Sequence, residues 1–122
     1  MQTDVKTRNG RRIAVVTAEG KLLESVRDAL DLMATVRYET GCERVVLYQE
    51  AVAEAFFILS TRLAGEILQK FVNYHMKLAV IGDYCGYTSK PLKDFIRESN
   101  AGNDVFFVAT LEEALEKLSC AG

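Results

Sequence analysis

One uninterrupted apolar segment, KLAVIG at Lys77 to Gly82, constrains the fold of this chain most strongly. Its apolar residues do not alternate with polar ones, which is typical of a strand that is covered on both faces. The twelve-residue stretch before it, LAGEILQKFVNY, has its apolar residues at helical spacing, and Pro91 fits the first turn of a helix that follows it. A buried strand between two amphipathic helices is the repeating unit of a parallel α/β sheet.

The remaining segments extend the same alternation in both directions. Asn9-Gly10 predicts a tight hairpin turn, and Ser25, Gly41 and Thr110 predict helix ends. The predicted strands are 4–8, 11–17, 44–49, 77–82 and 105–108, and the predicted helices begin near 25, 51, 61, 90 and 110. We therefore expect an α/β fold in the order β-β-α-β-α-β-α-β-α. Residues 1–122 would form one domain around a single-layer, mixed, mostly parallel five-stranded sheet flanked by helices.

Charge and composition exclude several classes of protein. The net charge is −2, so no overall field favours nucleic acid or anionic lipid, and no apolar run is long enough to cross a membrane. A basic strand edge that resists edge-to-edge pairing accounts for Arg8, Arg11 and Arg12. The start of the chain has no apolar signal-peptide region, and three widely spaced cysteines do not form a disulfide framework. We expect a cytoplasmic protein.

Candidate site residues gather where strands end and helices begin. Ser60 and Thr61 are candidates for the cap of the main helix and for a phosphorylated hydroxyl or contact point, two roles that are compatible, and Arg62 follows them. The next loop supplies Asp83, Tyr84, Tyr87, Thr88, Ser89 and Lys90. This loop is interpretable as a structural turn, as an anion or small-molecule site at a helix start, or as a protein-contact surface with two tyrosines.

Other catalytic arrangements can be examined by chain direction. Glu50 and Asp83 both follow parallel strands, so we expect the two carboxylates at one end of the sheet, where they either divide acid and base roles or are solvated or cap a neighbouring element. His75 precedes a strand and Cys85 follows it, about 20 Å away at strand rise, which excludes a Cys-His pair. Cys42, His75 and Cys120 should lie toward the opposite end without the spacing of a zinc site. We expect no metal and no cofactor.

Three stretches, LAGEILQKFVNY, KLAVIGDY and YTSKPLKDFIRESN, resemble a bacterial family known only as domain of unknown function 4180. The resemblance extends from about Asp28 to Leu118 and brings no activity with it. The order of elements also resembles the STAS domain of sulphate-transporter tails and anti-sigma-factor antagonists. In that family an Asp-Ser-Ser/Thr-Gly motif at the start of the second main helix is phosphorylated by a partner kinase. The corresponding residues here are Leu59-Ser60-Thr61-Arg62, which keep the hydroxyls and lack the Asp and the Gly.

The sequence favours a non-enzymatic regulatory or protein-binding module over an enzyme. Its expected partner is another protein, such as a kinase-type regulator acting on Ser60 or Thr61, or a second copy of the chain; nucleic acid and membranes are not expected partners. One alternative is a small-molecule-binding or hydrolytic site built from Glu50, Asp83 and the loop from Tyr84 to Lys90. Another is a mainly structural subunit of a homo-oligomer.

Overall fold

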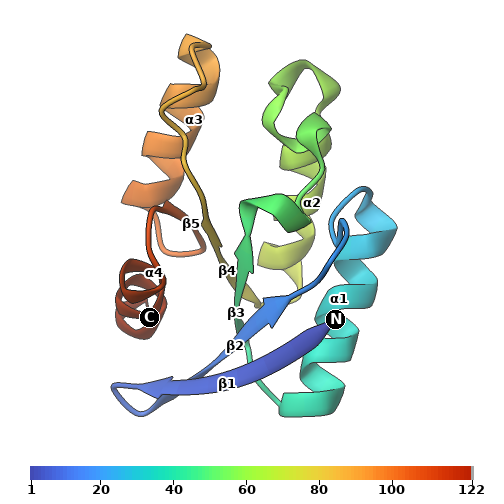
Figure 1. Ribbon diagram of the computed structural model, residues 1–122, viewed down its shortest axis with the longest axis vertical. Helices are drawn as coiled ribbons and strands as arrows, with labels where there is room; N and C mark the ends of the chain where they lie inside the picture. Colours follow the sequence, from blue (N-terminus) through green and yellow to red (C-terminus); the bar gives the residue numbers. More distant parts are fainter. Residues whose placement is uncertain (122) are drawn as a thin grey trace.

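The computed structural model describes residues 1–121, which form a five-stranded sheet with the strands in sequential order from β1 to β5 (Figure 1). The strands are β1 (Gln2–Arg8), β2 (Arg11–Thr17), β3 (Arg44–Tyr48), β4 (Lys77–Ile81) and β5 (Val105–Val108). The α-helices are α1 (Val26–Thr40), α2 (Leu63–Asn73), α3 (Lys90–Ala101) and α4 (Leu111–Cys120). The predicted mixed α/β class and element order are confirmed.

The hairpin that opens the chain forms as predicted. Asn9 and Gly10 have φ angles of 53° and 76°, the left-handed values that a two-residue turn of this kind requires. β1 pairs antiparallel with β2 from Arg8↔Arg11 outward, and the four strands from β2 to β5 are parallel. The sheet is therefore mostly parallel with one antiparallel strand at its edge.

Helices cover the two faces of the sheet unequally. α1, α2 and α3 each connect one strand to its next neighbour in the same direction, and right-handed crossovers place all three on one face. Their larger core includes Val36, Phe71 and Leu92, whereas α4 alone packs on the other face, through Leu115 and Leu118. Because the strand order never reverses, the sheet lacks the switch point at which doubly wound α/β folds bind ligands between strands. A site must instead be built from the loops at the sheet edge.

The predicted residues cap the helices. Ser25, Ser89 and Thr110 each accept a hydrogen bond from the backbone N–H three residues later. Gly41, with φ 72°, ends α1 in the left-handed conformation. These caps hold the elements that carry the candidate residues in place.

Arginines near the hairpin bind α4 and do not guard the sheet edge. Arg8 contacts Glu112 at 2.6 Å, and Arg11 donates to the carbonyl of Ala121. Arg44 of β3 donates to the same carbonyl at 3.0 Å. Arg11 and Arg44 thus stabilise an unpaired carbonyl at the C-terminus of α4, and Arg8 pairs with a carboxylate in its first turn, so contacts with α4 rather than protection of the sheet edge account for Arg8 and Arg11. The local sequence could not show that α4 returns to this corner.

The segment between β3 and α2 also differs from the prediction. Instead of one short helix from Ala51 to Phe57, it makes three 3₁₀ turns, η1 (Gln49–Ala51), η2 (Glu54–Phe57) and η3 (Leu59–Thr61). α2 begins at Leu63, and its N-cap is Arg62 with φ 63°, without a side-chain cap. The prediction that Ser60 or Thr61 is the N-cap of this helix is therefore wrong, although Thr61 Oγ1 accepts from the N–H of Leu63, the first residue of α2. No helix among residues 1–121 is long and apolar enough to cross a membrane.

Candidate functional site

An open groove at the carboxyl edge of the sheet brings the two predicted hydroxyl segments together. Its volume is about 510 Å³, and it lies between the η2–η3 segment and the loop that leads into α3. Figure 1 shows these two segments at the top of the view. The groove is lined by Glu54, Phe57, Ile58, Leu59, Ser60, Gly86, Tyr87, Thr88, Ser89, Pro91 and Leu92. Residues 28 positions apart in the sequence, Ser60 and Thr88, thus share one hollow.

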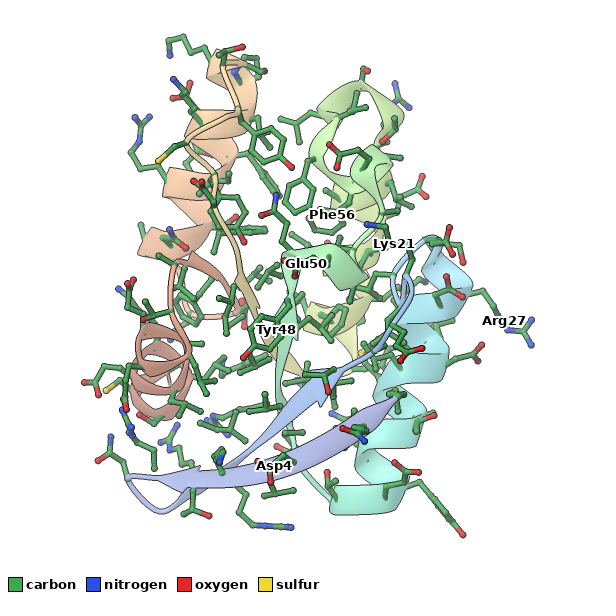
Figure 2. The ribbon with its side chains drawn as sticks, in the orientation of Figure 1. Asp4, Lys21, Arg27, Tyr48, Glu50 and Phe56 are labelled. Atoms are coloured by element: carbon green, nitrogen blue, oxygen red, sulfur yellow. The ribbon has the colours of Figure 1, made fainter. Side chains whose placement is uncertain are left out.

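Stacked aromatic rings form the wall beneath the groove. Phe57 stacks on Tyr87 with ring centroids 5.4 Å apart and planes inclined by 20°, and it also meets Tyr84 at 6.0 Å. Phe107 of β5 contacts Phe57 and Tyr84 edge-on. Aromatic pairs of this kind stabilise a structure beyond the effect of burying their apolar area. They therefore hold the loop from Asp83 to Ser89 against Phe57 of η2 and Phe107 of β5. Figure 2 labels Phe56, whose ring packs on Phe57 at 5.0 Å within this cluster.

Tyr84 is a part-buried, neutral member of this wall. Its hydroxyl donates to the carbonyl of Val80 at 2.7 Å. Burial raises the pKa of the Tyr84 phenol far above its usual value, and the nearby Tyr87 and Glu50 add to the rise. A phenol that stays protonated to high pH does not act as a base near neutral pH.

Gln49 is a site residue that the sequence analysis missed. Its Nε2 donates to the Tyr87 hydroxyl at 2.8 Å, and its Oε1 accepts from the backbone N–H of Asp83 at 3.0 Å. The side chain crosses over Gly82, where a Cβ would lie 2.7 Å from the Cβ of Gln49. The available signal was an amide directly after β3, opposite a glycine that ends the neighbouring strand.

Ser60 and Thr61 have different surroundings. Thr61 Oγ1 lies 2.7 Å from the Ala55 carbonyl oxygen and accepts from the Leu63 N–H at 3.3 Å. The Ser60 hydroxyl is exposed in the groove and has no hydrogen-bond partner among residues 1–121. Thr61 therefore holds the local turn together, and Ser60 is the member of the pair that is free to react or bind.

The remaining polar residues of the loop close turns. Asp83 Oδ1 accepts from the Cys85 N–H at 3.0 Å, and Ser89 Oγ accepts from Leu92 at 3.4 Å. Lys90 reaches along α3 to Asp94 at 2.8 Å. This hydrogen-bonded pair raises the pKa of Lys90 and lowers the pKa of Asp94. Lys90 does not line the groove, whereas Tyr87, Thr88 and Ser89 do.

The two predicted carboxylates do not share a hollow. Asp83 lines a separate depression of about 710 Å³ whose other walls include Cys85 and Glu113 and exclude Glu50. Glu50 is exposed in η1, where Figure 2 labels it. The structure therefore does not bring Glu50 and Asp83 to one closed pocket.

His75 lies on the opposite rim of the sheet from Ser60 and Cys85. It follows Tyr74, the C-cap of α2, and has a left-handed φ of 57°; the N–H of Met76 donates back to the Phe71 carbonyl at 2.9 Å, which completes a helix-ending motif. Within residues 1–121, no three histidine, cysteine or acidic side chains are close enough together to hold a metal ion. Cys42 is buried, whereas Cys85 and Cys120 are exposed free thiols.

Residues 8–118 match the model of the family described as domain of unknown function (DUF4180). The chain belongs to this family. The match covers β2 to β5, α1 to α3, most of α4 and the groove, so these features are part of the DUF4180 domain, whereas β1 lies outside the match except for Arg8. No curated protein and no solved structure shows significant similarity to the chain.

Proposed function

We propose that this DUF4180 domain is a regulatory protein-binding module that contacts its partner through the groove, with Ser60 as the switch residue. The observation that carries the proposal is the free, exposed Ser60 hydroxyl in an open groove beside apolar side chains. Ile58, at the same rim, is 52% exposed. With Leu59 and Leu92 in the same lining it forms a contiguous apolar patch with polar residues around it, which is typical of a surface that meets another protein.

The surroundings of Ser60 also suit a phosphoryl group. The N-terminus of α3 lines the groove opposite through Ser89, Pro91 and Leu92, and helix N-termini favour negative charge. Glu54 lies in the same groove and would repel a phosphate. Modification of Ser60 would therefore change the charge that a partner meets in the groove, which is what a switch requires.

The resemblance in element order to STAS antagonists supports the same proposal. In those domains a kinase modifies a hydroxyl at the start of the second main helix, and Ser60 stands just before α2 here. The free Ser60 and the bonded Thr61 favour Ser60 as the target. The predicted partner is a protein kinase or another regulator that recognises the groove.

Site-specific cross-linking in the native host tests the groove as the contact surface. A photoreactive residue at position 58 is expected to give a discrete adduct with a partner protein, and the matched control at exposed Gln69 of α2 should give none. Ser60→Glu should reduce the yield of the adduct, whereas Ser60→Ala should preserve it. Equal adducts from both positions, or none from position 58, would overturn the proposed contact surface.

Mass spectrometry of the protein isolated from the same cells tests the switch. We expect a phosphate on the peptide that contains Ser60, and its loss in Ser60→Ala but not in the Thr61→Val control. A phosphate that persists in Ser60→Ala would place the modification elsewhere and contradict the proposal.

The alternative function, a small-molecule or hydrolytic site that uses Glu50 and Asp83, receives less support. Glu50 is absent from the hollow that Asp83 lines, and Asp83 already binds the backbone of its own loop. Paired acid and base catalysis needs both carboxyl groups to reach one substrate.

A further inference from the structure

The two edge strands of the sheet, β1 and β5, differ in the hydrogen-bond partners of their outward backbone groups. At the β5 edge, Asn100 of α3 donates to the Phe107 carbonyl at 3.1 Å and accepts from the Phe107 N–H at 2.7 Å. This amide takes the place of a neighbouring strand and blocks further pairing there. At the β1 edge, only β2 pairs with the strand.

The backbone groups that β1 directs outward can be assigned from the hairpin. In a two-residue hairpin the pair that closes the turn, here Arg8↔Arg11, is hydrogen-bonded, and inward and outward residues alternate along the strand from that point. Thr7, Val5 and Thr3 therefore direct their N–H and C=O groups away from β2. Among residues 1–121, no turn, loop or side chain hydrogen-bonds to these groups. β1 thus presents an open edge seven residues long.

The sequence of β1 is complementary to itself in the antiparallel direction. When two copies of QTDVKTR are paired about Val5, each Asp4 faces Lys6 of the other copy and each Thr3 faces Thr7. Opposite charges across neighbouring strands stabilise pairing, and like charges oppose it. Moving the centre to residue 4 or residue 6 would place Asp4 against Asp4 or Lys6 against Lys6. The charges therefore select the register centred on Val5, and this register uses the outward-directed residues.

We propose that two copies of this chain associate through antiparallel β1 strands, with a twofold axis at Val5, to form one continuous sheet. A symmetric contact of this kind is self-limiting, because each copy offers one such edge. Asp4 and Lys6 are 68% and 48% exposed and lie 3.1 Å apart within one chain, so both are accessible to a second copy. Figure 2 labels Asp4 on β1, at the outer rim of the sheet. Strand pairing alone buries a small area, so the dimer depends on protein concentration.

Charge exchange tests the proposed pairing in the full chain. Sedimentation equilibrium at low ionic strength should give a mass that rises from monomer to dimer with concentration. Asp4→Lys and Lys6→Asp should each weaken the dimer about tenfold or more, because both cross-strand pairs become repulsive. An equimolar mixture of the two variants should recover the dimer as a heterodimer, and the double variant should recover it alone. Glu39→Lys, an exposed charge change on α1, should leave the association unchanged.

A second variant separates strand pairing from general charge effects. Thr3→Pro removes an outward N–H and leaves the bonds between β1 and β2 in place, so it should abolish the dimer without lowering the melting temperature appreciably. A monomer at all concentrations would overturn the proposal. A dimer that survives both Asp4→Lys and Thr3→Pro would overturn it as well, because that dimer would use another surface.

Discussion

At the scale of single residues, Gln49 organises the carboxyl edge of the sheet. Its amide joins the Asp83 backbone to the Tyr87 hydroxyl, so one side chain fixes the loop after β4 relative to the turn after β3. Because Tyr87 lines the groove, the position of this amide sets the shape of the groove wall.

Gly82→Ala should disturb this arrangement, because the added Cβ would lie 2.7 Å from the Cβ of Gln49. We expect the free energy of unfolding to fall by about 1–3 kcal/mol, as for other overpacked sites, in urea denaturation. Gly86→Ala is the matched control, since a Cβ there meets nothing within 4 Å. Gln49→Gly removes the Cβ that the new methyl group would meet, so if Gln49→Gly made together with Gly82→Ala does not recover part of the loss, the proposed clash is not its cause.

At the scale of elements, the helices are positioned by caps and by side chains from distant segments. Arg44 and Arg11 bind the last carbonyls of α4, and Arg37 of α1 donates to the carbonyl of Tyr74 at the end of α2. Burial, with the Arg11 charge as a smaller contribution, lowers the pKa of Arg44. The contacts of Arg44 and Arg11 join the sheet to α4 on one face, and the contact of Arg37 joins α1 to α2 on the other.

Asn100→Leu tests the element-scale role of α3 as a cover for the β5 edge. The substitution leaves the Phe107 N–H and C=O, a part-buried pair, without partners, so we expect a loss of about 1–3 kcal/mol of unfolding free energy. Amide hydrogen exchange of Phe107 should accelerate by a corresponding factor. Asn103→Leu, at an exposed turn, is the control and should change stability by less than about 0.5 kcal/mol. Unchanged exchange at Phe107 would show that Asn100 does not protect the edge.

At the scale of the whole molecule, the aromatic cluster couples stability to high pH. The pKa of Tyr84 is raised on folding, so the unfolded chain loses this proton first as pH rises above about 10, the ordinary phenol value. The stabilisation from neutral Tyr84 is complete below that pH and is lost as pH rises through the folded pKa.

Thermal unfolding between pH 9 and pH 11.5 measures this coupling. The melting temperature should fall above pH 10 in the native protein and fall less steeply in Tyr84→Phe, although that variant starts lower because it lacks the bond to Val80. Tyr38→Phe, whose side chain is 92% exposed, should keep the native steepness. Identical slopes for the native protein and Tyr84→Phe would contradict the assignment.

Local signals in the sequence determined the elements and their order. The Asn9-Gly10 turn, the Ser25 and Thr110 caps and the unbroken apolar run of β4 each depend on neighbours within a few residues, so they could be predicted without the fold. Chain direction likewise placed His75 and the hydroxyl loops on opposite rims, because His75 precedes a parallel strand and the loops follow parallel strands.

Only the tertiary structure decided which distant residues meet. The sequence could not reveal that Gln49 crosses to Tyr87, that Thr61 bonds inward while Ser60 stays free, or that Arg8 and Arg11 reach α4 and leave the β1 edge open. These contacts join segments whose approach depends on strand order and on how tightly each crossover packs, and neither is encoded in a local pattern. The composition of the edge loops was visible in the sequence, whereas the groove that joins two of them arose from packing around the aromatic cluster.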